Sequence, residues 1–143
     1  MRGTPKTMQH LTDYDNLVCE VVSSLRAQVD ALHDCGVTDV IVDPGFGFGK
    51  TLDQNYELLA RLGSFRELGV PLLVGMSRKS MLSRLLGVTA QESLNATTVV
   101  NTIALLQGAH FLRVHDVRQA VECRAIVEKT LRAAGDATPR HII

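Results

Sequence analysis

Three short apolar runs of the sequence each end in side chains that could bind a ligand. Asp43 ends the first run, and Ser77 and Lys79 follow the second. The third run closes with Arg113 and His115, which we call the anion clamp because both side chains could donate hydrogen bonds to an anion. A carboxylate can accept two hydrogen bonds from a flat heterocycle, whereas a guanidinium offers phosphate groups a planar fork and histidine adds a donor. If the runs are parallel strands, their carboxyl ends meet at one edge and form one site.

The first of these ends continues into "DPGFGFGKT", residues 43–51, which resembles a nucleotide-binding loop. A phosphate loop requires G-x-x-x-x-G-K-[ST], but Pro44 stands where the first glycine must be. The dinucleotide motif G-x-G-x-x-G also fails, because the three glycines are spaced one residue apart. We therefore assign no catalytic role to Lys50, and we expect the glycines to let a ligand approach Asp43 closely.

Four further residues shape the predicted site. Gly75 leaves the floor of the site without a side chain. Val114 lies between Arg113 and His115, and these two side chains project to the same side if the strand continues. Phe48 could wall an apolar ring. We expect Phe46 to pack beneath the rim of the site or against a neighbouring helix.

Each side chain also has a purely structural interpretation. Asp43 could cap a turn, and the basic pair Arg78 and Lys79 could be a solvated surface, with Arg78 pointing away from the site. Arg113 could form a structural salt bridge, for instance with Asp116. The coincidence of three polar run ends favours function over these alternatives.

Composition excludes several classes of protein. The 143 residues include 45% hydrophobic and 21% charged residues, which is typical of one globular domain. Fifteen basic and fifteen acidic residues give a net charge of zero, so we expect no nucleic-acid partner and no anionic membrane surface. The 3 cysteines lie far apart, which argues against a disulfide framework or a zinc site and favours the reducing cytoplasm. No apolar stretch is long enough to span a membrane.

Hydrophobic spacing predicts alternating helices and strands. Apolar residues four and three apart mark a first helix that ends near Cys35, and similar spacing marks three later helices. Short runs rich in apolar residues indicate buried strands. The helices are expected at about 18–34, 58–68, 92–107 and 120–134, with a short segment at 79–87, and the strands at 37–43, 70–76 and 109–114.

The order of these elements indicates an α/β fold with a parallel sheet buried on both faces. Two closures of such a sheet are possible. A doubly wound open sheet suits a chain of this length, because a barrel of eight strand and helix units needs about 250 residues. Length alone therefore favours the open sheet.

Four motifs together resemble a known family. "MRGTPKTMQ", "DPGFGFGKTLDQNYELLARL", "LLVGMSRKSML" and "GAHFLRVHDV" occur in the order and spacing found in the C-terminal half of bacterial dihydropteroate synthases. These are the folate-pathway enzymes that sulfonamides inhibit. The resemblance covers essentially the whole chain and is far more specific than a single glycine loop.

The resemblance revises the fold expected from length. The family is a TIM (β/α)8 barrel, so residues 1–143 would be its C-terminal part, an incomplete domain with three strands and their helices. The first five strands would be missing, and residues 136–143 would be a frayed tail. We expect a truncated or excised piece that is inactive alone, because its open strand edges would expose unpaired backbone and apolar surface.

The resemblance also implies an activity. The family condenses 6-hydroxymethyl-7,8-dihydropterin diphosphate with p-aminobenzoate, giving 7,8-dihydropteroate and pyrophosphate. By motif, Asp43 would bind the pterin ring above Gly75, and Lys79 would contact the pterin and shape the p-aminobenzoate pocket. Phe48 and Ser77 would border that pocket, where sulfonamides also bind. Arg113, Val114 and His115 would hold the departing diphosphate, so the catalytic residues would be Lys79, Arg113 and His115.

Further expectations come from the resemblance alone. Mg²⁺ is expected as a cofactor, with its protein ligand upstream of this chain and no metal ligand within it. The full-length protein is expected to be a homodimer in the cytoplasm.

Two other interpretations remain open. A pterin-binding methyltransferase barrel, which passes a methyl group from methyltetrahydrofolate to a corrinoid, shares acids at its strand ends. The S-R-K and R-V-H-D segments are better explained by a diphosphate-bearing substrate. The chain could also be a non-catalytic module of a split barrel whose open edges pair with a partner.

Overall fold

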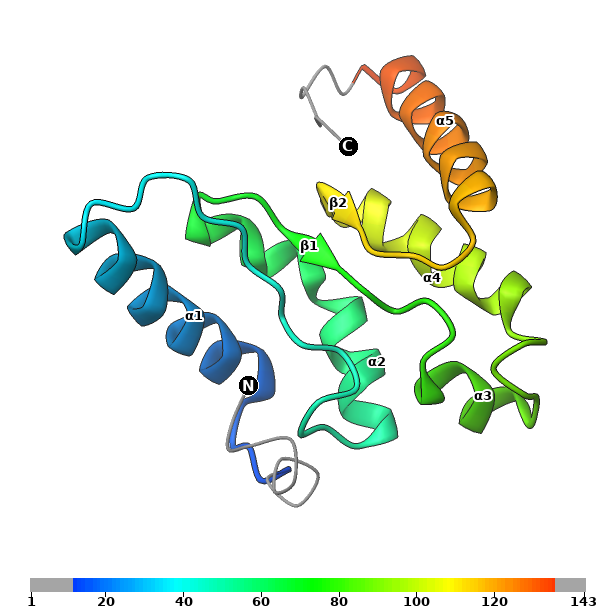
Figure 1. The fold of residues 1–143 in the computed structure, drawn as a ribbon, viewed down its shortest axis with the longest axis horizontal. Coiled ribbons are helices and arrows are strands. Elements are labelled where there is room, and N and C mark those ends of the chain that lie inside the picture. Colours follow the sequence, from blue (N-terminus) through cyan, green and yellow to red (C-terminus); the bar gives the residue numbers. More distant parts are fainter. Residues whose placement is uncertain (1–11, 136–143) are drawn as a thin grey trace.

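The computed structural model describes residues 12–135, in which helices alternate with short parallel strands (Figure 1). The first family motif, "MRGTPKTMQ", and the tail predicted at 136–143 lie outside these described residues. The elements are α1 (Leu17–Asp34), α2 (Leu52–Ala60), η2 (Leu62–Leu68), β1 (Leu73–Val74), α3 (Ser80–Leu86), α4 (Leu94–Leu106), β2 (Phe111–Leu112) and α5 (Val117–Ala133).

Three chain segments lie side by side in the centre of the molecule. β1 pairs with β2 in parallel, with Leu73 opposite Phe111. On the other side of β1, Val42 forms a single parallel bridge with Leu72. The parallel arrangement predicted from the sequence is confirmed, although each regular strand is shorter than the apolar run that predicted it.

The prediction of a buried strand at 37–43 is wrong. The segment forms only the Val42 bridge, and the side chains of Val37 and Ile41 are 41% and 52% exposed. A strand is buried only where elements cover its faces and pair with its edges. Among the described residues, a neighbouring strand lies only on the β1 side of Val42.

The first two helices begin at side-chain caps. Asn16 accepts a hydrogen bond from the backbone of Cys19 at the start of α1. Thr51 and Gln54 form a reciprocal capping box at the start of α2. These caps satisfy backbone N–H groups that have no partner inside a helix, which fixes where each helix begins.

The helix predicted at 58–68 is two elements. α2 ends at Ala60, and η2 continues as a 3-10 helix that buries Leu62, Phe65 and Leu68. Gly63 and Ser64 follow the break, and both residue types weaken an α-helix. The predicted apolar residues are therefore buried, but on a tighter helix that ends at Gly69 with a positive φ of 70°.

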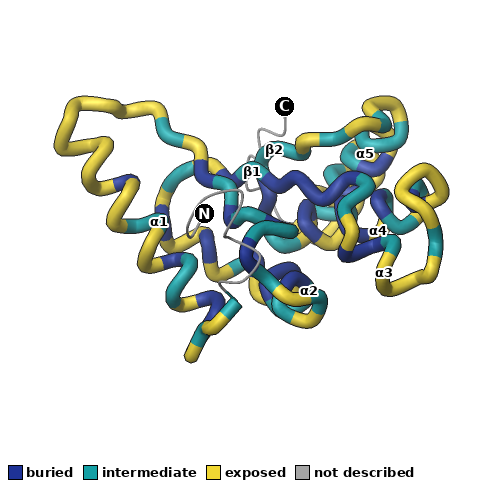
Figure 2. The backbone as a smooth tube through the Cα atoms, turned by 60° about the horizontal axis from the view of Figure 1, so that its bottom comes forward, coloured by how far each residue is buried: buried dark blue, intermediate teal, exposed yellow. Residues whose placement is uncertain are grey.

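The core lies between the central segments and the helices that cover them, as the dark region of Figure 2 shows. Phe46, Val74 and Met76 are fully buried there. A smaller cluster joins α4 to α5 through Leu105, Cys123 and Val127. Within residues 12–135, no helix has the length and apolar character to cross a membrane.

Candidate functional site

Asp43 uses its two carboxylate oxygens differently. Oδ1 accepts a hydrogen bond from the backbone N–H of Gly45 at 2.8 Å, so the turn-capping interpretation describes this oxygen. Oδ2 lies 3.6 Å from Nη2 of Arg113, which comes from the end of another strand. The Asp43 side chain is partly exposed, so it is not closed off from a ligand.

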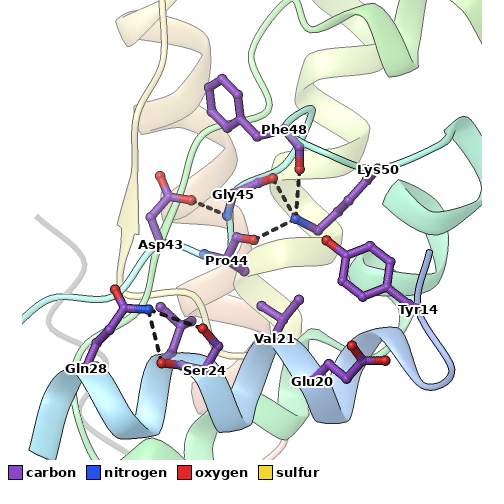
Figure 3. A pocket seen from close by; sticks show the side chains of 11 residues that line it. Tyr14, Glu20, Val21, Ser24, Gln28, Asp43, Pro44, Gly45, Phe48 and Lys50 are labelled. Carbon is purple, nitrogen blue, oxygen red and sulfur yellow. Dashed lines mark hydrogen bonds between the residues drawn. The ribbon is translucent and has the colours of Figure 1, made fainter. Parts of the chain in front are cut away.

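Lys50 holds the glycine-rich loop together (Figure 3). Its ammonium donates to the backbone carbonyls of Pro44 at 3.1 Å, Gly45 at 2.9 Å and Phe48 at 3.2 Å. Tyr14 donates to the carbonyl of Gly49 at 3.1 Å and ties the same loop to the segment before α1. The lysine that makes this loop resemble a phosphate loop thus neutralises backbone carbonyl dipoles.

The loop also places one phenylalanine in the core and one at the site. Phe46 is fully buried, as expected, whereas Phe48 is half-buried. Between them, Gly47 has a φ of +77°, and a Cβ there would lie 3.2 Å from Cδ of Lys79. Its N–H donates to the buried Asn55 at 2.7 Å. Glycine is required here by both backbone conformation and the close approach of Lys79.

Lys79 lies beneath this loop. Its ammonium donates to the carbonyl of Phe46 and lies 4.3 Å from the centre of the Phe48 ring. Burial lowers the pKa of Lys79 below its ordinary value, and the positive charge of Arg113 lowers it further, while Asp43 acts in the opposite direction. The site therefore contains a partly desolvated cation next to an aromatic face.

The lowered pKa predicts a pH-dependent stability. Between the pKa of Lys79 in the folded protein and the ordinary lysine value of about 10.4, the unfolded chain binds more protons, so the free energy of unfolding rises with pH. Lys79→Met should remove this rise. Urea unfolding of the wild type and the variant at several pH values from neutral to about 10.4 measures it.

The exposed Lys129 on α5 supplies the matched control. Lys129→Met should follow the wild-type pH dependence, because this change leaves Lys79 and its surroundings in place. A constant difference between wild type and Lys79→Met across the whole range would contradict the prediction.

Arg78 pairs with Asp116. Its Nε and Nη2 lie 3.0 and 2.6 Å from the two carboxylate oxygens. This bidentate contact is the main cause of the lowered pKa of Asp116. Asp116, which the sequence offered as a partner of Arg113, is therefore engaged by Arg78 instead.

The backbone at Arg78 is unusual. Its φ is +56°, and Arg78 is the one residue other than glycine with a positive φ in the part of the chain that the structure describes. The Arg78 N–H donates to the hydroxyl of Thr97 on α4 at 3.2 Å. A left-handed conformation is unfavourable for arginine, so these side-chain contacts stabilise it.

Ser77 links the same two strand ends. It is buried, and its hydroxyl oxygen lies 3.2 Å from the backbone nitrogen of His115 and 3.0 Å from Nδ1 of the His115 ring. The sequence placed Ser77 next to a substrate, but its hydroxyl is occupied by contacts within the protein.

Gly75 makes room for Arg113. A Cβ on Gly75 would lie 2.9 Å from Nε and 3.0 Å from Nη2 of Arg113, so the guanidinium occupies the space that a side chain would fill. The floor predicted from the sequence is thus covered by the planar group of the anion clamp, which lies across it.

The structure brings most of the predicted residues to one pocket of about 350 Å³. It is lined by Gly75, Ser77, Arg78, Lys79, Arg113, Val114 and His115. Asp43 and Phe48 instead line an adjoining hollow of about 310 Å³ that faces α1 (Figure 3). The Asp43–Arg113 and Phe48–Lys79 contacts connect the two hollows.

Sequence reasoning missed the residues that support this site. Thr97 and Asn55 are buried polar residues on helices, where their types alone give no functional signal. Asp116 was considered only as a partner of Arg113. Among residues 12–135, no group of three or more histidine, cysteine, aspartate and glutamate side chains could hold a metal ion.

The chain matches one family and resembles several characterised proteins. Residues 1–115 match the family described as "Pterin binding enzyme". The dihydropteroate synthase of Escherichia coli K12 is 47% identical over 135 residues, and that of Synechocystis is 40% identical over 135 residues. These matches cover 93% and 92% of this chain, but the chain spans about half the length of these relatives, 48% and 47%.

Solved structures that are similar to this chain include dihydropteroate synthases. A Yersinia pestis dihydropteroate synthase in complex with a sulfonamide drug has a TM-score of 0.89 at 43% identity, over 93% of this chain and 49% of that one. The Thermus thermophilus enzyme in complex with 6HMPPP has a TM-score of 0.84 at 39% identity, over 88% and 51% of the two chains.

These relatives decide between the two closures of the sheet. They are TIM-barrel enzymes, so the open doubly wound sheet favoured by length is wrong, and the expected partial barrel is confirmed. The prediction from chain length was wrong because the described elements are consecutive units of a larger closed sheet, and the length of one part does not indicate the size of the whole sheet. The chain belongs to the family of pterin-binding enzymes.

Proposed function

We propose that the chain is the C-terminal part of a dihydropteroate synthase. The whole barrel would condense 6-hydroxymethyl-7,8-dihydropterin diphosphate with p-aminobenzoate. One observation carries the proposal: Lys79, Arg113 and His115 line a single pocket at the ends of two neighbouring strands. Two adjacent cations and an imidazole suit a substrate that bears a diphosphate next to a polar heterocycle.

The anion clamp would stabilise the leaving group. As the C–O bond between the pterin methylene and the diphosphate breaks, the electron pair leaves with the pyrophosphate. The guanidinium of Arg113 and a ring N–H of His115 can donate to the oxygens that gain this charge. Both come from the same strand end, so their separation is set by the backbone.

The remaining residues would hold the two organic groups. Oδ2 of Asp43 can accept from N–H groups of the pterin, and Lys79 can donate to a ring nitrogen or carbonyl. Phe48, beneath whose ring Lys79 lies, would border the p-aminobenzoate. The amine of p-aminobenzoate then forms the C–N bond and loses a proton, with no covalent bond to the protein.

The relatives support this function over the methyltransferase. A Thermus thermophilus dihydropteroate synthase was solved in complex with 4-aminobenzoate as well as with 6HMPPP. The S-R-K and R-V-H-D segments also contribute Arg78, Lys79, Arg113 and His115 to one pocket. The interaction-module interpretation is favoured by exposed apolar side chains such as Ile41, Val117 and Ile126.

Three further proposals follow from the resemblance. The complete barrel is proposed to use Mg²⁺, with the protein ligand of the ion upstream of this chain. A homodimer of the complete barrel and a cytoplasmic location are also proposed. The three cysteines are all free, which suits a reducing compartment.

A chimeric barrel tests the proposed function. The part of the Escherichia coli enzyme that precedes the matched region is joined to residues 1–143, and pyrophosphate release that depends on p-aminobenzoate is measured. We expect turnover by the chimera and none by residues 1–143 alone or by the Escherichia coli part alone. A folded chimera that binds pterin without turnover would contradict the synthase assignment, and turnover by residues 1–143 alone would contradict the need for the other strands.

A further inference from the structure

The hydroxyl of Ser77 has few ways to arrange its hydrogen bonds. It carries one hydrogen and two acceptor lone pairs. One lone pair accepts the backbone N–H of His115, at 3.2 Å. The hydrogen and the second lone pair are then left for Nδ1 of the His115 ring, at 3.0 Å. Because Ser77 is only 6% exposed, water competes weakly for these contacts.

We propose that Ser77 is a positioning residue that keeps a hydrogen on Nε2 of His115. In a neutral imidazole with its hydrogen on Nδ1, the hydrogen of the buried Ser77 hydroxyl would have no acceptor among the described contacts. The Ser77 hydroxyl therefore donates to Nδ1, and the ring hydrogen is on Nε2. When the imidazole is charged, Nδ1–H donates to Ser77 and Nε2 also carries a hydrogen. Nε2, on the ring edge opposite Ser77, is therefore a donor in both states.

Two contacts of the neighbouring Arg78, with Asp116 and with Thr97, fix the backbone next to Ser77. Next to it, Arg78 adopts its left-handed conformation while Nε and Nη2 of its guanidinium bind Asp116. The hydroxyl of Thr97 on α4 accepts a hydrogen bond from the Arg78 backbone N–H. Two neighbouring pairs join the same two strand ends: Ser77 contacts His115, and Arg78 contacts Asp116. The partners in each pair are 38 residues apart in the sequence.

A donor on Nε2 has a use in an anion site. Arg113, Lys79 and Arg78 supply positive charge around the pocket, while Asp43 and Asp116 already have cationic partners. An anion oxygen could not accept from an imidazole whose exposed nitrogen lacks a hydrogen. Only this last step rests on the proposed function, because the bonding of His115 is a property of the chain itself.

The tautomer can be read directly by NMR. Long-range ¹H–¹⁵N spectra of the labelled 143-residue chain are recorded at alkaline pH, and a His115→Gln variant assigns the His115 signals. The spectra should show that Nε2 carries the hydrogen and that Nδ1 accepts a hydrogen bond. Ser77→Ala should remove the acceptor shift of Nδ1 and produce a fraction with the hydrogen on Nδ1. Ser93→Ala removes another buried serine hydroxyl, one that donates to Ala90, and should leave His115 unchanged.

A double-mutant cycle tests the consequence for anion binding in the chimeric barrel. Ser77→Ala should weaken binding of inorganic pyrophosphate about tenfold, the effect of losing one well-oriented hydrogen bond to a charged group. In a His115→Ala background the same change should have almost no effect, because Ser77 acts through His115.

The outcomes separate this inference from the proposed function. A wild-type ring with its hydrogen on Nδ1, or an unchanged His115 spectrum in Ser77→Ala, overturns the positioning role. Equal losses from Ser77→Ala with and without His115 also overturn it, since they indicate direct contact with the anion. Absence of pyrophosphate binding in the wild-type chimera counts against the proposed function, and the NMR result then decides the role of Ser77 alone.

Discussion

Arg113→Ala is expected to lower kcat/KM of the chimeric barrel about 10²–10³-fold, the range seen when one donor to a developing charge is removed. The guanidinium lies over Gly75 and reaches Asp43, so its loss removes both the fork for the diphosphate and the charge next to the heterocycle. Arg113→Lys should lose less, because lysine keeps the charge but not the planar pair of donors. Steady-state kinetics with both substrates measures these effects.

Stability should hardly change in Arg113→Ala. The arginine side chain is 62% exposed, and its contact with Asp43 is 3.6 Å long, so this ion pair should contribute less than about 1 kcal/mol to the free energy of unfolding. Arg118, which is 86% exposed and pairs with Glu122 on α5, offers a control with the same change of charge. If Arg118→Ala lowered activity as much as Arg113→Ala, general electrostatic attraction would explain the loss and the clamp would not.

Asp43→Asn is expected to reduce kcat/KM about 10²-fold or more, mainly through weaker binding of the pterin substrate. The asparagine carbonyl can still accept the Gly45 N–H, so the loop should keep its conformation. The amide nitrogen would then face the pterin with donors where the carboxylate offers an acceptor. Unpaired donors that face each other in a site are strongly unfavourable.

The exposed Asp39, in the same segment, provides the matched control. Asp39→Asn should retain wild-type kinetics. Thermal unfolding of both variants distinguishes recognition from folding. A fall in activity of Asp43→Asn that matched its fall in thermal stability would indicate that Asp43 only caps the turn.

The sequence by itself determined the alternation of elements and the positions at which chemistry could occur. Helix periodicity located α1 and α5 to within a few residues, since a repeated apolar face leaves a clear pattern. The polar ends of the apolar runs located Lys79, Arg113 and His115. Parallel strands present their carboxyl ends at one edge, so this inference needed no knowledge of side-chain contacts.

The tertiary structure decided which polar groups pair. Arg113 could have paired with Asp116, three residues away, but it lies near Asp43, while Asp116 binds Arg78. The choice depends on the left-handed turn at Arg78, and a strained backbone is stabilised by contacts between distant segments. Local propensity contains no information about such contacts.

Burial was also decided by tertiary structure. Val37 and Ile41 have the residue types of a buried strand, yet both are exposed, whereas Ser77 is polar and buried. A side chain is buried when other segments cover it, and which segments do so depends on the whole arrangement of the barrel. The sequence therefore specified the chemistry available at the strand ends, while the packing of one strand end against the next decided which groups remain free to meet a ligand.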